Sequence, residues 1–295
     1  MSFARHETFY IRDGWLRKGI KLVKGDQGFD FFRSEEAPEV LGMGKNMVNA
    51  LRFWLIATGI VEPQENNKNN FVVSDFAKLI DENDPYLEDE GTLWLIHYHL
   101  VTNKNYATTW YWFFNIFNHN EFDYETFMYW LKNYTITENF KIAESSLKKD
   151  FQCLINTYLY EKMLSKNNSP EDNLNCPLRN LKLIKRSGPK SYQLNRINRK
   201  SLHPLVFFFA VKRWQERNNK PREITISNII DEPENASKTF SLSFDDVIYY
   251  LEECQKLNLL HVSRTAGLDS VFLQPIDAHN CLIDYYNSKE VVANV

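Results

Sequence analysis

The segment from Leu41 to Gly59 constrains the fold of this chain more than any other part of the sequence. Glycines stand near both of its ends, and apolar residues recur between them at helical spacing, namely Met47, Leu51, Trp54 and Leu55. Lys45, Asn49 and Arg52 fall at i, i+4 and i+7, so they share the opposite face of a helix. The pattern predicts an amphipathic helix with an apolar inner face, a basic outer face and Gly59 as its C-cap.

The residues after this helix predict a two-stranded hairpin. Ile60-Val-Glu and Phe71-Val-Val-Ser are strand-like, and the polar run 64–70 separates them. A helix followed by a hairpin with a polar tip is typical of a winged helix-turn-helix, whose helix enters the DNA major groove. The same module can also serve as a dimerisation or scaffold element without nucleic acid. Gly42-Met-Gly-Lys45 does not match a Walker phosphate loop, because the glycine spacing is wrong and Asn46 replaces the Ser or Thr.

Length and composition favour a folded protein of one large or two to three modest domains. The chain has 295 residues, of which 43% are hydrophobic and 15% aromatic. No window is apolar enough to span a bilayer, and the N-terminus lacks the apolar core of a signal peptide, so we expect a cytoplasmic protein without membrane contact. The four cysteines are scattered without a CxxC pair, which favours reduced thiols and argues against structural zinc.

Charge is strongly segregated along the chain although the net charge is only −3. The stretch 178–222 holds 13 Lys and Arg against one acidic residue, whereas 75–90 holds seven Asp and Glu against one lysine. A basic stripe within an acidic protein is suited to tracking a DNA backbone. The alternatives are a solvated loop or an intramolecular partner for the acidic run.

These patterns predict a mainly α protein with small β-wings, in which two winged-helix modules flank an aromatic-rich helical middle. We expect an N-terminal winged-helix domain over 1–80, a helical middle over 91–165, a basic linker over 166–200 and a winged-helix-like domain over 201–285. The helix expected at 244–257 carries Asp245, Asp246, Glu252 and Glu253, which would repel phosphate. We therefore interpret the C-terminal module as structural or protein-binding, and assign any DNA contact there to the basic helix 204–217.

Four strings, taken together, resemble a known family. They are Arg5-His-Glu-Thr-Phe-Tyr-Ile-Arg-Asp-Gly-Trp-Leu-Arg-Lys-Gly19, Gly42-Met-Gly-Lys-Asn-Met-Val48, Trp94-Leu-Ile-His97, and Cys153 followed by Glu171-Asp-Asn-Leu-Asn-Cys-Pro-Leu178. Their order and spacing resemble domain-of-unknown-function family 4007, found beside sulfur-transfer genes in bacterial DNA phosphorothioation clusters. The resemblance runs from about residue 3 to residue 285.

The resemblance implies a role in DNA modification and antiviral defence. It implies as partners DNA, a cysteine desulfurase and an ATP-dependent sulfur-insertion protein. It also implies nicking of a DNA strand, the reaction of the family member in single-strand phosphorothioation systems. Composition and periodicity give no sign of nicking. A non-catalytic scaffold that recruits the sulfur-transfer proteins, or a transcriptional regulator, are the alternatives.

A nick requires an activated nucleophile, neutralisation of phosphate charge and a proton for the leaving oxygen, and most nucleases obtain them with metal ions. The sequence contains no cofactor motif and no recognisable nuclease signature, and a nickase would be expected to use Mg²⁺ or Mn²⁺. One candidate set is His6 and Glu7 with the cations Arg5, Arg12 and Lys18. Alternatively, Arg5, Glu7 and Arg12 form salt bridges that close the N-terminus onto the helix module.

A second candidate set is Asp150 with Glu171 and Asp172, which could gather around a metal. The alternative is that the two later acids begin a helix, where they would complement its dipole. Cys153 and Cys176 lack an adjacent base, so packing is the expected role of both thiols.

The candidate DNA contacts come from both basic regions. In the first helix, the cations would hold phosphates and the asparagines could read an adenine edge. The full set is Lys18, Lys45, Asn46, Asn49, Arg52, Lys185, Arg186, Lys190, Arg199, Lys200, Lys212 and Arg213.

Overall fold

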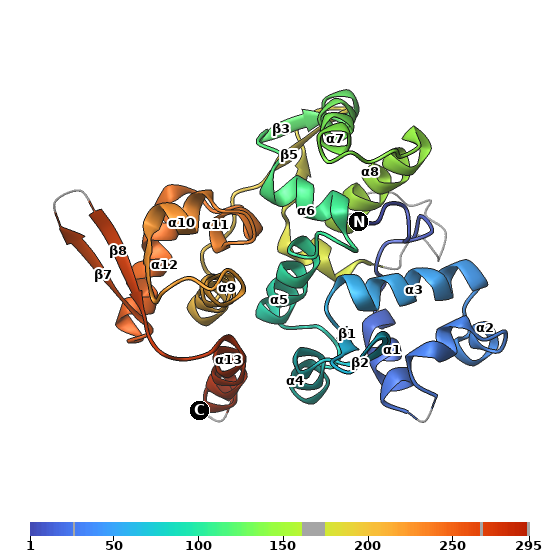
Figure 1. Cartoon of the computed structure of the whole chain (residues 1–295), viewed down its shortest axis with the longest axis horizontal. Helices are drawn as coiled ribbons and strands as arrows, with labels where there is room; N and C mark the ends of the chain where they lie inside the picture. The colour runs from blue at the N-terminus through green and yellow to red at the C-terminus, as the bar shows by residue number, and fades with distance from the viewer. Residues whose placement is uncertain (26, 161–174, 266–267, 294–295) are drawn as a thin grey trace.

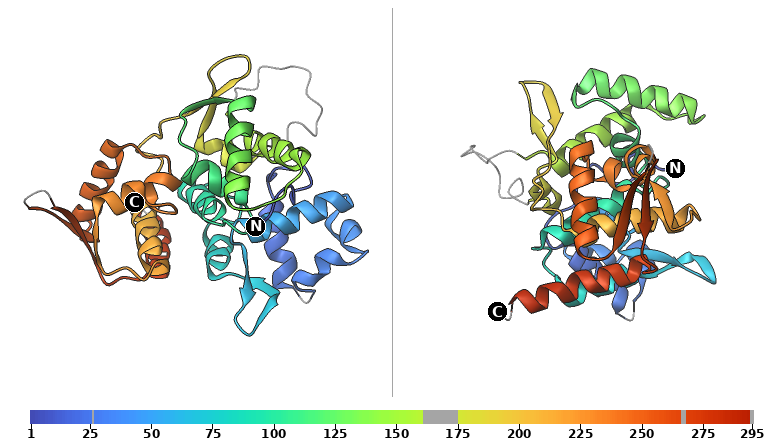
Figure 2. Two further views of the ribbon diagram at one scale, coloured as in Figure 1. Left: turned by 45° about the horizontal axis from the view of Figure 1, so that its top comes forward. Right: turned by 90° about the vertical axis from the view of Figure 1, so that its left-hand side faces the viewer.

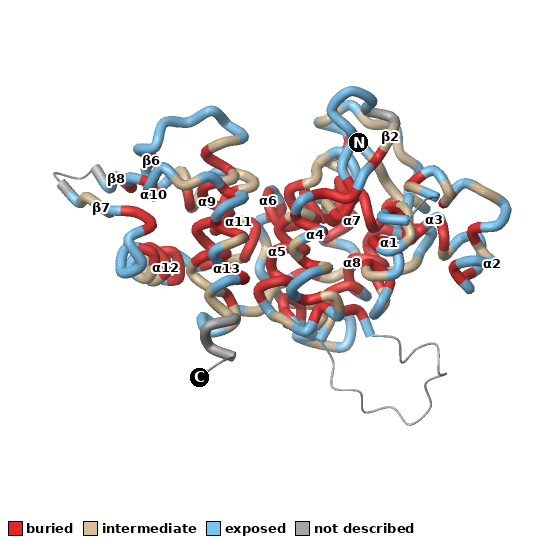
Figure 3. Tube along the Cα trace, turned by 90° about the horizontal axis from the view of Figure 1, so that it is seen from below, coloured by how far each residue is buried: buried red, intermediate tan, exposed pale blue. Residues whose placement is uncertain are grey.

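The computed structural model describes residues 1–25, 27–160, 175–265 and 268–293. It is 54% helix and 12% strand with small antiparallel sheets, which confirms the mainly α class. One continuous hydrophobic core runs through the chain, and buried segments extend from the N-terminal helices through the centre to the C-terminal helices (Figure 3). None of the helices within the described ranges combines the length and apolar composition that crossing a membrane requires.

The N-terminal region forms a helix-and-hairpin unit on one side of the molecule (Figure 1). Its elements are α1 (Trp15–Lys24), the 3-10 helix η1 (Phe29–Arg33), α2 (Ala37–Leu41), α3 (Lys45–Ala57), β1 (Val61–Gln64), β2 (Asn67–Val73) and α4 (Asp75–Asn83). The helix and the hairpin that the 41–73 pattern predicts are both present. Strands β1 and β2 are antiparallel, with Val61 opposite Val73. Leu51, Trp54 and Leu55 are fully buried, as their spacing predicts.

The middle region consists of α5 (Glu90–Val101), α6 (Thr108–Asn115), β3 (Glu121–Asp123), α7 (Tyr124–Thr137) and α8 (Glu144–Tyr158). Helix α5 is apolar on nearly every side and lies in the centre of the molecule, between the N-terminal and C-terminal regions (Figure 1). Its His97 accepts a hydrogen bond from the Tyr158 hydroxyl at Nδ1 and donates from Nε2 to the Thr239 carbonyl, both at 2.7 Å. His99 points elsewhere and stacks on Phe76 at 4.4 Å. The two histidines are core and interface residues, as their spacing indicates.

A small sheet lies where the sequence pattern indicates only a basic linker. The 3-10 helix η2 (Pro177–Leu181) precedes β4 (Ile184–Arg186) and β5 (Ser191–Leu194). Strand β5 pairs with β3 on one side and β4 on the other. Ser187-Gly-Pro189 is the tip of the β4–β5 hairpin, so the turn signal marks a hairpin within a folded segment.

The C-terminal region begins with α9 (Pro204–Arg217), whose bounds match the predicted helix. Then come β6 (Glu223–Thr225), α10 (Ile226–Asp231), α11 (Ala236–Thr239), α12 (Phe244–Lys256), β7 (Leu260–Thr265), β8 (Leu268–Leu273) and α13 (Ala278–Ala293). The sheet order is β6-β8-β7. Helix α13 was not predicted; it packs on α9 and also reaches α4, so it joins the two ends of the chain (Figures 1 and 2).

Candidate nucleic-acid interface

The outer face of α3 is polar and accessible. Lys45, Asn46 and Asn49 are exposed, and Arg52 is half-buried one turn further along. The helix begins after Gly44, which has no side chain to cap it, and its first turn contains no acidic residue. The free N–H groups and the positive end of the helix dipole therefore open onto the surface that carries Lys45, a combination that attracts anions.

Arg52 provides an incompletely paired cation on this face. Its guanidinium lies over the Phe29 ring at 5.0 Å, and its Nε is buried without a hydrogen-bond partner among the described residues. Burial and, next, the nearby Arg33 cation lower the pKa of Arg52. An arginine still keeps its charge at neutral pH, so an incoming anion would relieve both effects.

The N-terminal segment crosses α3 beside a cavity of about 510 Å³. The cavity is lined by Met1, Ser2, Arg5, Glu7, Asn49, Arg52, Phe53, Ile56, Asn105 and Tyr106. It brings Arg5 and Glu7 of the N-terminal candidate set together with Asn49 and Arg52 of the helical set. Both Arg5 and Glu7 are exposed. Sequence reasoning missed Asn105 and Tyr106, because a loop between two buried helices carries no pattern that marks it as part of a site.

His6 and Asp150, which belong to different candidate sets, form one buried pair. The backbone N–H of Thr8 donates to His6 Nδ1, so Nε2 carries the ring proton and donates to the Asp150 carboxylate at 2.8 Å. The same carboxylate accepts from the Ala4 N–H at 2.7 Å and from the Thr109 hydroxyl at 2.5 Å. Both side chains are about 1% exposed. They fasten the N-terminal segment to α6 and α8, and thereby hold Arg5 and Glu7 at the cavity.

The other residues of the catalytic candidate sets lie outside this cavity. The Arg12 guanidinium lies against Phe9 and Trp15, and the Lys18 ammonium donates to the Leu41 carbonyl at 2.8 Å. Neither Arg5, Glu7 nor Arg12 forms an ion pair with another described residue, so the alternative of a salt-bridged N-terminus gains no support. Glu171 and Asp172 fall outside the described residues.

No metal site can be assigned to the described part of the chain. No three His, Cys, Asp or Glu side chains gather there in a way that would hold an ion. Cys153 and Cys176 are free, and burial strongly raises the pKa of both thiols, which makes them packing residues, as predicted.

The candidate cations of the basic stretch are distributed over several elements. Arg199 pairs with Asp246 at 2.7 Å and lies over the Tyr249 ring. Lys212 is only 6% exposed and donates to Gln215 at 2.8 Å, so this lysine offers no charge to the surface. The remaining positions are Lys185 and Arg186 in β4, Lys190 in the turn before β5, Lys200 in the connection between β5 and α9, and Arg213 on α9. The stretch therefore does not form one continuous stripe.

Comparison with known proteins identifies the family. The family model described as "Protein of unknown function (DUF4007)" matches residues 3–286. A structure described as "Magnesium ion-bound SspB crystal structure" is similar with a TM-score of 0.84 and 27% identity, over 97% of this chain and 88% of that one. A second, "SspB crystal structure", has a TM-score of 0.82 and 27% identity, over 98% and 87%. No curated protein sequence matches the chain. Since the family model spans nearly the whole chain, as the resemblance implies, the protein belongs to the DUF4007 family.

Proposed function

We propose that this protein is a DNA-binding component of a bacterial DNA phosphorothioation system. The likeness to SspB along nearly the whole chain supports the place in such a system. The exposed polar face of α3, which leads into the cavity of Arg5 and Glu7, supports DNA as the ligand. A cysteine desulfurase and an ATP-dependent sulfur-insertion protein are the partners that we infer from the family.

In this proposal α3 acts as the recognition helix of a winged helix, with the β1–β2 hairpin as its wing. Lys45 and Arg52 hold phosphates, and the uncapped start of α3 adds backbone N–H donors. Asn46 and Asn49 can each donate to N7 and accept from the amino group of adenine in the major groove. The helix therefore supplies both backbone contacts and base contacts from one exposed face.

We further propose that the protein nicks a DNA strand, with Glu7 as the best-placed general base. Glu7 is exposed in the cavity, whereas His6 and Asp150 are buried against each other. Glu7 would accept a proton from a water that attacks phosphorus, while Arg5 and Arg52 neutralise the phosphate. The phosphorus–oxygen bond to the leaving sugar oxygen breaks, that oxygen takes up a proton from solvent water, and Glu7 returns the proton that it accepted to solvent. Mg²⁺ would supply further charge neutralisation when bound, but the described residues include no group of three His, Cys, Asp or Glu side chains that fits it.

A non-catalytic scaffold is the second candidate, and α12 favours it. Asp245 and Glu252 are exposed on this helix beside Phe244, which is 58% exposed. A face that is both acidic and apolar is suited to a basic protein partner and unsuited to phosphate.

A supercoiled-plasmid assay tests the proposal. Wild type, Glu7→Gln and Lys45→Ala/Asn49→Ala are incubated with plasmid, with and without Mg²⁺ or Mn²⁺. We expect open circles with wild type, retained binding without nicking for Glu7→Gln, and loss of both for the α3 variant. If the protein binds the plasmid without nicking it, and the affinity falls steeply as salt rises, the non-catalytic scaffold is the function that remains. No binding to plasmid or to duplex oligonucleotides would overturn the proposed function.

A further inference from the structure

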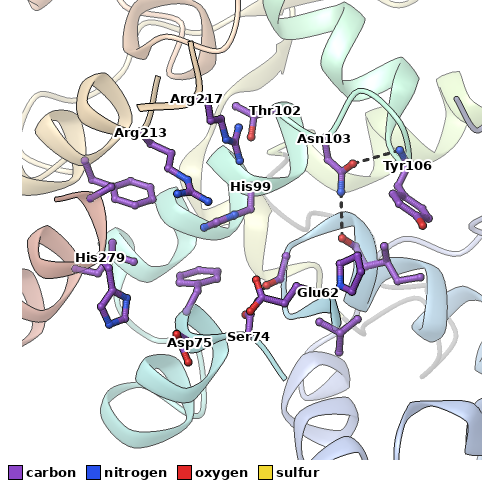
Figure 4. A pocket seen from close by; sticks show the side chains of 18 of the residues that line it. Glu62, Ser74, Asp75, His99, Thr102, Asn103, Tyr106, Arg213, Arg217 and His279 are labelled. Carbon is purple, nitrogen blue, oxygen red and sulfur yellow. Dashed lines mark hydrogen bonds between the residues drawn. The ribbon is translucent and has the colours of Figure 1, made fainter. Parts of the chain in front are cut away.

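A second cavity lies between the N-terminal and C-terminal regions. Its volume is about 460 Å³, within the roughly 300–1,000 Å³ range of small-molecule sites. Helix α9 and the start of α13 form one wall, the β1–β2 hairpin and α4 form the other, and the end of α5 forms the floor (Figure 4). Sequence reasoning could not find this cleft, because its walls come from opposite ends of the chain.

The C-terminal wall is cationic. Arg213 and Arg217 are four residues apart on α9, so they project from the same face, and Figure 4 shows both guanidinium groups converging above His99. Each arginine has only a loose carboxylate partner, at 3.8 Å from Glu216 and 3.4 Å from Glu234 respectively. Both guanidinium groups can therefore reorient toward an anion in the cleft.

The floor is an aromatic stack. The His99 ring lies on Phe76 with an interplanar angle of 24°. Gly59 makes room for it, since a β-carbon at this position would lie 2.8 Å from His99 Nδ1. Burial and the two arginines lower the pKa of His99 to about 3, so the imidazole is neutral at physiological pH. It adds a flat surface without adding charge.

The N-terminal wall is acidic. Glu62 on β1 and Asp75 at the start of α4 face the cleft, and His279 of α13 also lies on its lining. Burial, followed by the nearby Asp75, raises the pKa of Glu62. Neither carboxylate reaches Arg213 or Arg217 as an ion pair within the described part of the chain. The opposed charges are thus held apart, with room for a ligand that complements both.

From this geometry we infer that the cleft binds one unstacked nucleotide of single-stranded DNA. The phosphate would lie between Arg213 and Arg217, and the exocyclic amino group of a base would donate to Glu62; cytosine, adenine and guanine carry such a group, whereas thymine does not. A cleft of about 460 Å³ has the size of a small-molecule site and cannot admit a whole duplex, whose major groove alone is ~12 Å wide. The inference extends the proposed function by naming single-stranded DNA as a second ligand form.

The cleft adjoins the cavity beside α3. Ile56 and Tyr106 line both, and Tyr106 is 37% exposed. A strand that leaves the Arg5 and Arg52 cavity would pass the Tyr106 ring, on which a base can stack, before it reaches Arg213. In this inference a DNA strand separated from its complement would run past both cavities in turn.

Fluorescence anisotropy with labelled oligonucleotides tests the inference. The probes are (dC)12, (dT)12 and a 20-base-pair duplex, and the proteins are wild type, Arg213→Gln/Arg217→Gln, Glu62→Gln and Tyr106→Ala. The matched control is Lys220→Gln/Arg222→Gln, which removes two exposed cations of the same region outside the cleft. Far-UV circular dichroism checks that every variant is folded, and Arg213→Lys/Arg217→Lys should rescue part of the loss.

We expect the arginine pair variant to bind (dC)12 at least about tenfold more weakly, while duplex affinity changes less than about threefold. Glu62→Gln should remove a preference for (dC)12 over (dT)12, and Tyr106→Ala should weaken both single strands by roughly tenfold. A similar loss in the control variant, or unchanged single-strand binding in the arginine variant, would overturn the inference. So would displacement of (dC)12 by equimolar dCMP, which would indicate a free-nucleotide site. Duplex binding without single-strand binding overturns only this inference, whereas absence of both overturns the proposed function as well.

Discussion

The N-terminal and C-terminal regions contain the same local arrangement, a helix followed by an antiparallel hairpin, with opposite surface chemistry. Helix α3 leads into β1–β2, with Val61 opposite Val73, and α12 leads into β7–β8, with Leu260 opposite Leu273. The exposed face of α3 carries lysine, arginine and asparagine, whereas that of α12 carries acids. In the proposed function, the charge on the outer face, and not the arrangement of elements, therefore distinguishes the ligands of the two modules.

The two helices also begin differently. Helix α12 starts with a complete capping box, in which Ser243 and Asp246 each accept a backbone N–H of the other residue. Asp246 also holds Arg199 at 2.7 Å. Helix α3 begins at Gly44 with its first N–H groups free of any side-chain cap. One N-terminus is satisfied internally, and the other can bind an anion.

The largest expected effect comes from reversing the charge of each helix in turn. Lys45→Glu/Asn49→Glu should weaken duplex DNA binding by about 100-fold, because two carboxylates would face the phosphates. Asp245→Lys/Glu252→Lys on α12 should change DNA affinity by less than about threefold. Anisotropy titrations at two salt concentrations measure both. A larger loss of affinity from the α12 variant would show that DNA binds the C-terminal module and not α3.

How well the sequence predicts these two regions depends on the range of the interactions. The helices α3, α9 and α12 were predicted because apolar spacing and end signals are local. Helix α13 was missed although Cys281, Leu282, Tyr285 and Tyr286 repeat at helical spacing. This pattern is as local as those of the other three helices and predicts a helix equally well, so α13 is an exception to the dependence on range.

The candidate site was only half predictable. The exposed residues of α3 follow from periodicity, but the approach of Glu7 to Asn49 depends on the His6–Asp150 pair, which joins positions 144 residues apart. Judged from its neighbours in the sequence, each residue is given a separate function: His6 is predicted to be catalytic and Asp150 to bind a metal. Only the fold shows that both side chains are buried and that they position neighbouring residues.

Acid should weaken the contact of central helix α5 with the C-terminal region. Burial lowers the pKa of His97 to about 3, below its ordinary 6.5, so the unfolded chain binds more protons between these values. The stabilisation is complete above pH 6.5 and is lost as pH falls toward 3, by roughly 2–3 kcal/mol at about pH 4.5. Because His97 bonds Thr239 of the C-terminal region, this contact should fail first.

Urea unfolding between pH 4.5 and 7.5 measures this dependence. His97→Gln should be less stable at neutral pH and should show a shallower loss toward acid. His261→Gln, an exposed histidine on β7, serves as the control and should follow wild type. Equal slopes for wild type and His97→Gln would show that another group causes the acid sensitivity.

The smallest effects concern the two helix starts, and here stability and DNA binding should not change together. Ser243→Ala removes the cap of α12 and should cost about 1 kcal/mol of unfolding free energy without changing DNA affinity. Gly44→Ser adds a cap to α3, where the backbone has ordinary dihedrals and a β-carbon meets nothing within 4 Å. It should stabilise the protein by a few tenths, roughly 0.3 kcal/mol, yet weaken DNA binding about threefold, because the serine hydroxyl takes the N–H that a phosphate would use. Thermal unfolding and anisotropy on the same samples separate the two quantities. If Gly44→Ser binds duplex as tightly as wild type, the start of α3 does not contact phosphate, and the difference between the two helices rests on their side chains alone.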